Sequence, residues 1–136
     1  MTSIVLVMHE PLGSSFASCS EHVLGEKPDL TVFDVPPDGD PEVLSSELAG
    51  ILKQTSDGQA TLVLCDIFGA TPFNIAKRAI KLVSEEGYGA HLITGTNLCM
   101  VLKALTERQD NPEQLSKNVQ LGAQKGIVNA DNECKC

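Results

Sequence analysis

The sequence predicts an α/β fold: an open, doubly wound and mostly parallel sheet with helices on its flanks. Short apolar runs, typical of strands buried on both faces, alternate with amphipathic helical segments along the whole chain. No repeat, low-complexity block or linker interrupts this alternation. Because 136 residues are enough for one well-buried core, we expect one domain over residues 1–130 and a short tail over residues 131–136.

The first strand, helix and second strand follow from local composition. Residues 4–8 are continuously apolar, as in a buried strand, and residues 14–24 have helical periodicity before Gly25, a typical C-cap. Residues 30–35 are rich in β-forming side chains and predict the second strand. The apolar face of the intervening helix is expected to consist of Phe16, Cys19, Val23 and Leu24.

In the middle of the chain two helices start in the same way. Asp40-Pro41 and Thr71-Pro72 each place an N-capping residue before a proline at the first helical position. The first helix is expected to end near residue 54 and the second near residue 86, with an apolar strand at residues 60–65 between them.

The last third of the chain supplies a fourth strand and two more helices. Residues 90–94 are the strand, and Asn97 or Thr96 caps a helix that ends near residue 106. Asn111-Pro112 begins a helix that ends near residue 124. Residues 126–130 are too short and polar for a central strand, so we interpret them as an edge strand that could join a neighbouring subunit.

Charge and hydropathy exclude several classes of function. A formal net charge of −8 repels phosphate backbones, so we expect no nucleic-acid partner, whereas the same field favours a basic protein partner. No apolar run reaches the roughly 18 residues of a membrane span, and no signal-peptide pattern opens the sequence. We therefore expect a cytoplasmic protein without membrane insertion.

The five cysteines point neither to a disulfide framework nor to a metal site. Cys19, Cys65 and Cys99 lie in apolar segments and are expected to be reduced, buried side chains. Cys134 and Cys136 belong to the tail, and no second pair of ligands accompanies them.

No cofactor is expected either. His22 and His91 have no partner at metal-binding spacing, so we interpret them as solvated or hydrogen-bonded side chains. The glycine-rich motifs that bind nucleotides are absent after the first strand, and so is the serine motif of the α/β hydrolases.

Two of the predicted strands run into polar residues at their carboxyl ends. His9 follows the first strand and Asp66 the third, and neighbouring parallel strands end at one edge of a sheet, where ligand chemistry gathers. An Asp66 carboxylate that accepts the Nδ1–H of His9 would leave Nε2 unprotonated and nucleophilic. Gly69 allows a tight backbone approach, and Thr71 can cap its helix and offer a hydroxyl to an anion. The helix starts after these strands would favour phosphate.

Three motifs occur in order along the chain. The first is a strand followed by His9; the second is Asp66-Ile67-Phe68-Gly69-Ala70-Thr71-Pro72-Phe73-Asn74; the third is Gly95-Thr96-Asn97-Leu98-Cys99-Met100. Together they resemble the mannose-family enzyme IIA domain of the bacterial phosphoenolpyruvate-dependent sugar phosphotransferase system (PTS), whose patterns are D-x-x-G-G-[ST]-P-x-N and G-x-N-x-x-M. The similarity covers nearly the whole chain, including residues 122–127.

The resemblance implies a function, partners and an assembly. It implies that His9 accepts a phosphoryl group from the phosphocarrier protein HPr and passes it on, usually to an enzyme IIB domain, while Asp66 orients its ring. The expected contacts to phosphate or partner are Gly69, Ala70, Thr71 and Asn97. The family also exchanges a C-terminal strand within a homodimer, which would account for residues 126–130. Because the sequence stops soon afterwards, we expect a separate chain to supply the acceptor.

Two residues depart from the family pattern. Ala70 stands where the family has a second glycine, so the turn should not require a positive φ there. Glu10 stands beside His9, where many relatives have glycine, and its carboxylate should repel an incoming phosphate unless it points away. Alternatively, Glu10 tunes the choice of partner or the lifetime of the phosphohistidine.

Three other interpretations remain open. A regulatory phosphoacceptor would use the same His9 chemistry in a PTS without a sugar permease. A receiver-like domain would be phosphorylated on Asp66, with Mg²⁺ near Glu10, although such sites need clustered acids. A binding module would hold a small molecule at the sheet edge and take up no phosphoryl group.

Overall fold

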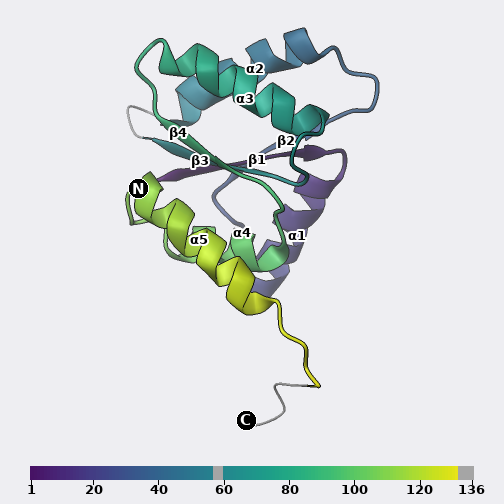
Figure 1. The fold of residues 1–136 in the computed structure, drawn as a ribbon, viewed down its shortest axis with the longest axis vertical. Coiled ribbons are helices and arrows are strands. Elements are labelled where there is room, and N and C mark those ends of the chain that lie inside the picture. Colours follow the sequence, from purple (N-terminus) through teal and green to yellow (C-terminus); the bar gives the residue numbers. More distant parts are fainter. Residues whose placement is uncertain (57–59, 132–136) are drawn as a thin grey trace.

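The computed structural model describes residues 1–56 and 60–131, which form a four-stranded sheet flanked by five helices. The predicted tail cysteines, Cys134 and Cys136, lie outside the described residues. The strands are β1 Ser3–His9, β2 Thr31–Val35, β3 Thr61–Cys65 and β4 Ala90–Ile93. The helices are α1 Leu12–Leu24, α2 Pro41–Ser56, α3 Thr71–Ser84, α4 Leu98–Thr106 and α5 Pro112–Gly126 (Figure 1).

The sheet has the order β2-β1-β3-β4, and each neighbouring pair of strands is parallel. The predicted open, doubly wound α/β fold is therefore confirmed. From β1 the chain adds β2 on one side and then β3 and β4 on the other, so its direction of winding reverses at β1. In folds of this kind the crevice outside the carboxyl ends of the strands, at the point of reversal, is where ligands bind.

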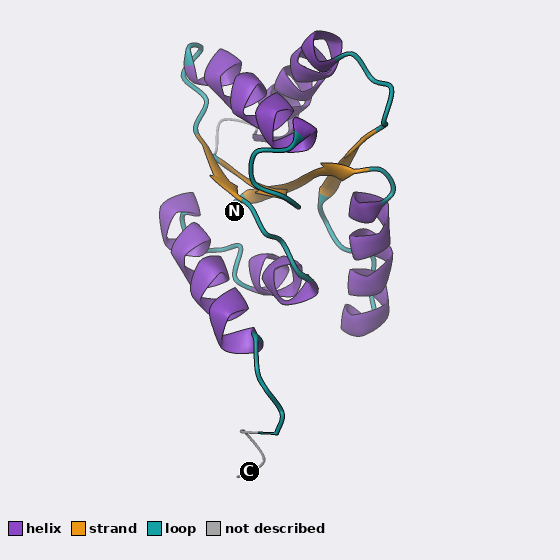
Figure 2. Cartoon of the chain, turned by 45° about the vertical axis from the view of Figure 1, so that its right-hand side comes forward, coloured by secondary structure: helices purple, strands orange, loops and turns teal. Residues whose placement is uncertain are grey.

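Helices cover both faces of the sheet (Figures 1 and 2). Helices α2 and α3 lie on one face, and α1, α4 and α5 lie on the other. Alternate residues of β1 enter the two cores: Val5 and Val7 pack with α2 and α3, whereas Ile4, Leu6 and Met8 belong to the opposite core. Burial on both faces explains why the strands read as continuous apolar runs rather than as alternating ones.

Helix α1 packs differently from the prediction. It begins two residues earlier than expected, and Val23 and Leu24, placed on its apolar face, are exposed, with 55% of the surface of Val23 accessible. The residues that it buries fully are Gly13 and Ser20. Small side chains allow the helix to lie close to β2, and a pattern of apolar residues carries no sign of that close approach.

Several boundaries and two buried positions also differ. Helices α2 and α5 each extend two residues beyond their predicted ends, and residues 126–130 form no strand, because Gly126 ends α5 and Ile127 follows in extended conformation. Of the three cysteines expected to be buried, Cys65 is buried but Cys19 and Cys99 are exposed, so the expectation for these two was wrong.

Gly13 is the position where α1 and β2 approach most closely. A Cβ atom there would lie 2.4 Å from Oδ1 of Asp34 and 2.9 Å from Cγ1 of Val32. The Asp34 carboxylate cannot simply turn away, because it accepts hydrogen bonds from the N–H groups of Gly13 and Ser14. We therefore expect Gly13→Ala to lower the free energy of unfolding by about 1–3 kcal/mol, measured by urea denaturation.

Gly50, in the middle of α2, provides the matched control. A Cβ atom at Gly50 would meet no heavy atom within 4 Å, and alanine is the better helix former. Gly50→Ala should therefore raise the unfolding free energy by about 0.5–1 kcal/mol. Equal stability of the two variants would show that the close contact at Gly13 does not constrain the fold.

Candidate functional site

The candidate site lies at the carboxyl edge of the sheet. His9 is the last residue of β1 and pairs with Val35 at the end of β2, while Val7 pairs with Cys65 at the end of β3. Asp66 follows Cys65 directly, so the register brings the ends of β1 and β3 together. The predicted meeting of His9 and Asp66 at one sheet edge is realised in the structure.

One carboxylate oxygen of Asp66 holds His9 at two points. Oδ2 lies 2.7 Å from Nδ1 of the His9 ring and accepts the backbone N–H of the same residue at 2.9 Å. Oδ1 accepts the backbone N–H of Ile67 at 2.9 Å. The side chain of Asp66 is only 6% exposed, whereas that of His9 is 48% exposed. Asp66 is therefore a buried residue that positions His9. The edge of the His9 ring that does not face Asp66 is open to solvent.

The environment of Asp66 keeps it ionised. Burial by itself would raise the pKa of this carboxyl, but hydrogen bonds from the backbone N–H and ring of His9, the His9 charge and the N–H of Ile67 lower it below its ordinary value of 3.8. An ionised carboxylate accepts a hydrogen bond from Nδ1–H and thereby favours the neutral tautomer with the lone pair on Nε2. The contact between Nδ1 and Asp66 is the arrangement expected from the sequence, and the nucleophilic role of Nε2 stays a prediction.

The turn after Asp66 depends on one glycine rather than two. Gly69 has a φ of 82°, which favours glycine, whereas Ala70 has a φ of −82° and a ψ of 176°. The expectation that Ala70 needs no positive φ is confirmed. Gly69 and Ala70 shape the backbone that leads into α3.

Thr71 does not cap α3, contrary to the prediction. Ala70 is the N-cap, no side chain caps the helix, and Thr71 is the first helical residue. Pro72 has no N–H, so the first turn presents the N–H groups of Thr71 and Phe73 without intrahelical acceptors. The exposed hydroxyl of Thr71 does not cap the helix and is therefore available to an anion.

A hollow of about 300 Å³ opens beside the His9 ring. The residues that line it are His9, Glu10, Val35, Pro36, Pro37, Gly39 and Thr71. The structure therefore brings Thr71 and Glu10 to the same hollow as His9.

Asn97 is not brought to this hollow. Its Oδ1 accepts the N–H of Met100 at 3.0 Å, so Asn97, rather than Thr96, is the N-cap of α4. It lines a separate hollow between β4, α4 and α5. The hydroxyl of the neighbouring Thr96 donates to the carbonyl of Cys65 at 2.6 Å. The N–H of Gly95 donates to the carbonyl of Asp66 at 3.1 Å. This motif therefore supports the backbone at Cys65 and Asp66, and Asn97 does not line the hollow beside His9.

Asp34 is the residue of this region that the sequence analysis missed. Its carboxylate accepts the N–H of Gly13 at 2.8 Å, and the N–H and hydroxyl of Ser14 at 3.1 and 2.8 Å. The amino end of α1, which follows His9, therefore already holds an anion, and α3 is left as the helix start that can favour phosphate. An aspartate next to the end of β2, at the same sheet edge, was the available signal.

Other chemistry finds no support in the part of the chain that the structure describes. No three His, Cys, Asp or Glu side chains of residues 1–56 and 60–131 are grouped so that they could hold a metal ion. Burial and the neighbouring Asp66 raise the pKa of the Cys65 thiol to about 12, so this thiol stays protonated. Among the described helices, none has the length and apolarity to cross a membrane.

Comparison with known proteins decides the family. A family model described as EIIA-man, PTS system fructose IIA component, matches residues 3–120. The chain belongs to the EIIA-man family. The resemblance found in the three sequence motifs is thereby confirmed, and the chain is a mannose-family EIIA component of the PTS.

Curated relatives of this EIIA-man chain include larger proteins. The PTS system mannose-specific EIIAB components of Escherichia coli K12 and of Shigella flexneri are each 29% identical over 110 residues, which cover 81% of this chain. That match covers 33% of each relative, so the chain spans about a third of the length of these curated relatives.

Solved structures share the EIIA-man fold. The phosphotransferase system component EIIA from Streptococcus agalactiae superposes with a TM-score of 0.81 at 23% identity, covering 97% of this chain and 99% of that one. The mannose/sorbose-specific IIA subunit from Enterococcus faecalis gives a TM-score of 0.80 at 22% identity, covering 94% and 93%. These likenesses establish the fold.

Proposed function

We propose that this chain is a cytoplasmic phosphoryl carrier that accepts a phosphoryl group from phospho-HPr on His9 and passes it to an enzyme IIB acceptor in sugar uptake. The observation that carries the proposal is the pair formed by His9 and Asp66, with 2.7 Å between Nδ1 and Oδ2. The lone pair of Nε2 attacks phosphorus, the bond from phosphorus to the donor nitrogen breaks, and its electron pair leaves with the donor. The Nδ1 proton stays in the hydrogen bond to Asp66.

The start of α3 supports the charge of the transferred group. Phosphoryl transfer needs positioning and stabilisation of the phosphoryl oxygens more than it needs covalent assistance. Thr71, the first residue of α3, lines the hollow beside His9, and no side chain caps the first turn of this helix. No cofactor enters the proposal, since two histidines exchange a phosphoryl group directly.

Exposed apolar side chains beside the site support docking of protein partners. Ile67 is 56% exposed and Phe68 is 75% exposed, although both belong to the turn that carries Asp66. The Phe68 ring packs on that of Phe73, with 4.8 Å between centroids, and Lys77 Nζ lies 5.7 Å from the centre of the Phe73 ring. Aromatic side chains held at a rim in this way are typical anchors of protein interfaces.

Reconstitution tests the proposal. The protein is incubated with phosphoenolpyruvate, enzyme I and HPr, and intact mass spectrometry follows the addition of one phosphoryl group. We expect a bond that survives base and is lost in acid, as in phosphohistidine. A bond cleaved by hydroxylamine would instead indicate an acyl phosphate on Asp66. If the protein takes up no phosphoryl group, the result would favour a module that binds a small molecule.

Transfer onward separates a transport role from a regulatory one. The phosphorylated protein is mixed with a mannose-family enzyme IIB domain, and loss of the phosphoryl group from His9 is followed over time. Rapid transfer supports the carrier, whereas a phosphoprotein that donates to no enzyme IIB supports a regulatory phosphoacceptor.

We also propose that the chain is a homodimer in which the segment after α5 joins the neighbouring subunit. Ile127 is 77% exposed and Val128 is 55% exposed, and β4 is an edge strand. Beside β4 lies a hollow of about 400 Å³ bounded by α4, α5 and Ile127. An edge strand with open N–H and C=O groups readily accepts a further strand.

Substitution of Ile127 tests this assembly. Ile127→Asp places a charge where the exchanged segment would be buried, so we expect the dimer to dissociate into monomers, measured by light scattering after size-exclusion chromatography. Val43→Asp alters an exposed apolar residue on α2, across the sheet, and should leave the dimer intact. A wild-type protein that is monomeric at all concentrations would refute the exchange.

A further inference from the structure

Glu10 is the charged residue closest in sequence to His9, and the two residues line the same hollow. Its backbone N–H donates to the carbonyl of Val35 at 3.0 Å, which fixes the chain at this point. Its exposed carboxylate makes no hydrogen bond or ion pair with the described residues. Glu10 therefore contributes a full negative charge that nothing in this part of the molecule neutralises.

Two other carboxylates at this edge of the sheet, those of Asp34 and Asp66, accept hydrogen bonds within the fold. Asp66 accepts two N–H groups and faces the His9 ring, and Asp34 accepts donors from Gly13 and Ser14. Their charges are thus partly compensated within the fold, whereas the carboxylate of Glu10, which also lines the hollow, has no donor among the described residues. This contrast sets Glu10 apart from the general acidity of the chain.

Among the described residues, no lysine or arginine lines the hollow. The two nearest cations in the sequence of α3 are engaged elsewhere: Lys77 lies over the Phe73 ring, and Arg78 pairs with Glu42 at 3.1 Å. A phosphoryl group on Nε2 would carry a charge between −1.5 and −2 near neutral pH, as phosphoryl groups do. The negative charge of Glu10 therefore opposes the approach of a phosphoryl donor to His9, unless that donor itself carries positive charge.

We propose that Glu10 makes His9 selective for phosphoryl donors that carry positive charge into the hollow and against free anionic phosphodonors. The inference rests on phosphorylation of His9, as in the proposed function, and adds a residue that determines which donors are used. The occupant favoured by the charges is a protein donor with basic side chains around its phosphoryl group. Such a donor neutralises Glu10 as it docks, while a small anion cannot.

The test compares two donors on the same protein. Phosphoramidate is the small anionic donor: Nε2 of His9 attacks its phosphorus, the phosphorus–nitrogen bond breaks, and ammonia leaves. Phospho-HPr is the protein donor. Glu10→Gln removes the negative charge of one carboxylate close to the incoming phosphoryl group. We therefore expect phosphoramidate to phosphorylate this variant about threefold to tenfold faster than the wild type at low salt. The gain should shrink in concentrated salt, which screens exposed charges.

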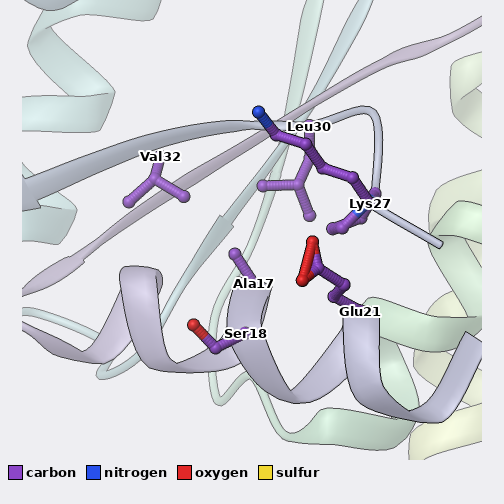
Figure 3. A pocket seen from close by; sticks show the side chains of 7 residues that line it. Ala17, Ser18, Glu21, Lys27, Leu30 and Val32 are labelled. Atoms are coloured by element: carbon purple, nitrogen blue, oxygen red, sulfur yellow. The ribbon is translucent and has the colours of Figure 1, made fainter. Parts of the chain in front are cut away.

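Glu21→Gln is the matched control. Glu21 lies on α1 and lines a different hollow, together with Lys27 and Val32 (Figure 3). This variant changes the net charge by the same amount, so it should label like the wild type with both donors. Glu10→Ala serves as a second variant, and thermal unfolding verifies that each protein is folded.

The outcomes separate this inference from the proposed function. A ratio of phospho-HPr to phosphoramidate labelling that falls threefold or more in Glu10→Gln supports it. A ratio within twofold of Glu21→Gln, or no labelling of Glu10→Gln by phosphoramidate, overturns it. If the wild type accepts phosphoramidate but not phospho-HPr, the proposed function fails, and the salt-dependent gain of Glu10→Gln with phosphoramidate alone decides the role of Glu10.

Discussion

Replacing His9 by alanine is expected to abolish phosphoryl uptake from phosphoenolpyruvate, enzyme I and HPr. The substitution removes the proposed nucleophile, and neither His22 nor His91 lines the hollow beside residue 9. The fold should survive, because the His9 side chain is half exposed and Asp66 keeps the two backbone N–H donors of residues 9 and 67. Intact mass spectrometry and thermal unfolding measure the two expectations separately.

His22→Ala is the control for this experiment. His22 is exposed on α1, so its loss should leave labelling and stability unchanged. Peptide mapping of the labelled wild type should place the phosphoryl group on His9. Labelling of His9→Ala at the wild-type rate would remove the basis of the proposed function.

Asp66→Asn should slow phosphoryl transfer by about a hundredfold or more, on the scale found when the carboxylate behind a catalytic histidine is replaced by its amide. Both carboxylate oxygens accept backbone N–H groups, Oδ2 from His9 and Oδ1 from Ile67. An amide NH₂ therefore faces a backbone donor in either orientation. When it occupies the position of Oδ2, it also donates to Nδ1 and selects the tautomer that protonates Nε2.

The same substitution should alter stability in a pH-dependent way. Loss of one backbone hydrogen bond is expected to lower the unfolding free energy by about 1–3 kcal/mol at neutral pH. Because the folded-state pKa of Asp66 is lowered, the wild type has its contribution in full above the ordinary value of 3.8 and loses it as pH falls through the lowered pKa. The difference between the two proteins should therefore shrink in acid, measured by urea denaturation across the acid range.

Asp38→Asn removes the same charge from the exposed loop after β2 and serves as the comparison. It should match the wild type in transfer rate and in its stability at low pH. An Asp66→Asn protein that transfers at the rate of Asp38→Asn would mean that the orientation of the His9 ring does not depend on the carboxylate.

The sequence was sufficient to predict the four strands of the sheet and the central pair of the site, although the expected strand at residues 126–130 does not form. A parallel sheet buried on both faces leaves continuous apolar runs in the sequence, and each such run here ends where polar chemistry begins. Because parallel strands share a carboxyl edge, the side chains after β1 and β3 had to lie near each other, and His9 and Asp66 do. The motif around Gly69 then indicated the family that the comparison confirmed.

The features that were predicted wrongly depend on close packing between elements distant in sequence. The buried face of α1 follows from the approach of Gly13 to Asp34, which sets the rotation of the helix and leaves Val23 exposed. Periodicity records which residues are apolar, not which small residues allow contact. Thr71 and Ala70 differ by one position at the start of α3, and propensity alone does not distinguish an N-cap from the first helical residue.

The half-exposed His9 ring lines the hollow at the carboxyl edge of the sheet, where a partner can reach it from solvent. In the proposed function, donor and acceptor each react at the same Nε2, so one must dissociate before the other arrives. Two partners that compete for one surface give ping-pong kinetics. The rate of phosphoryl transfer from donor to acceptor is then limited by how quickly each partner dissociates. Very tight binding of either partner would therefore slow the overall transfer.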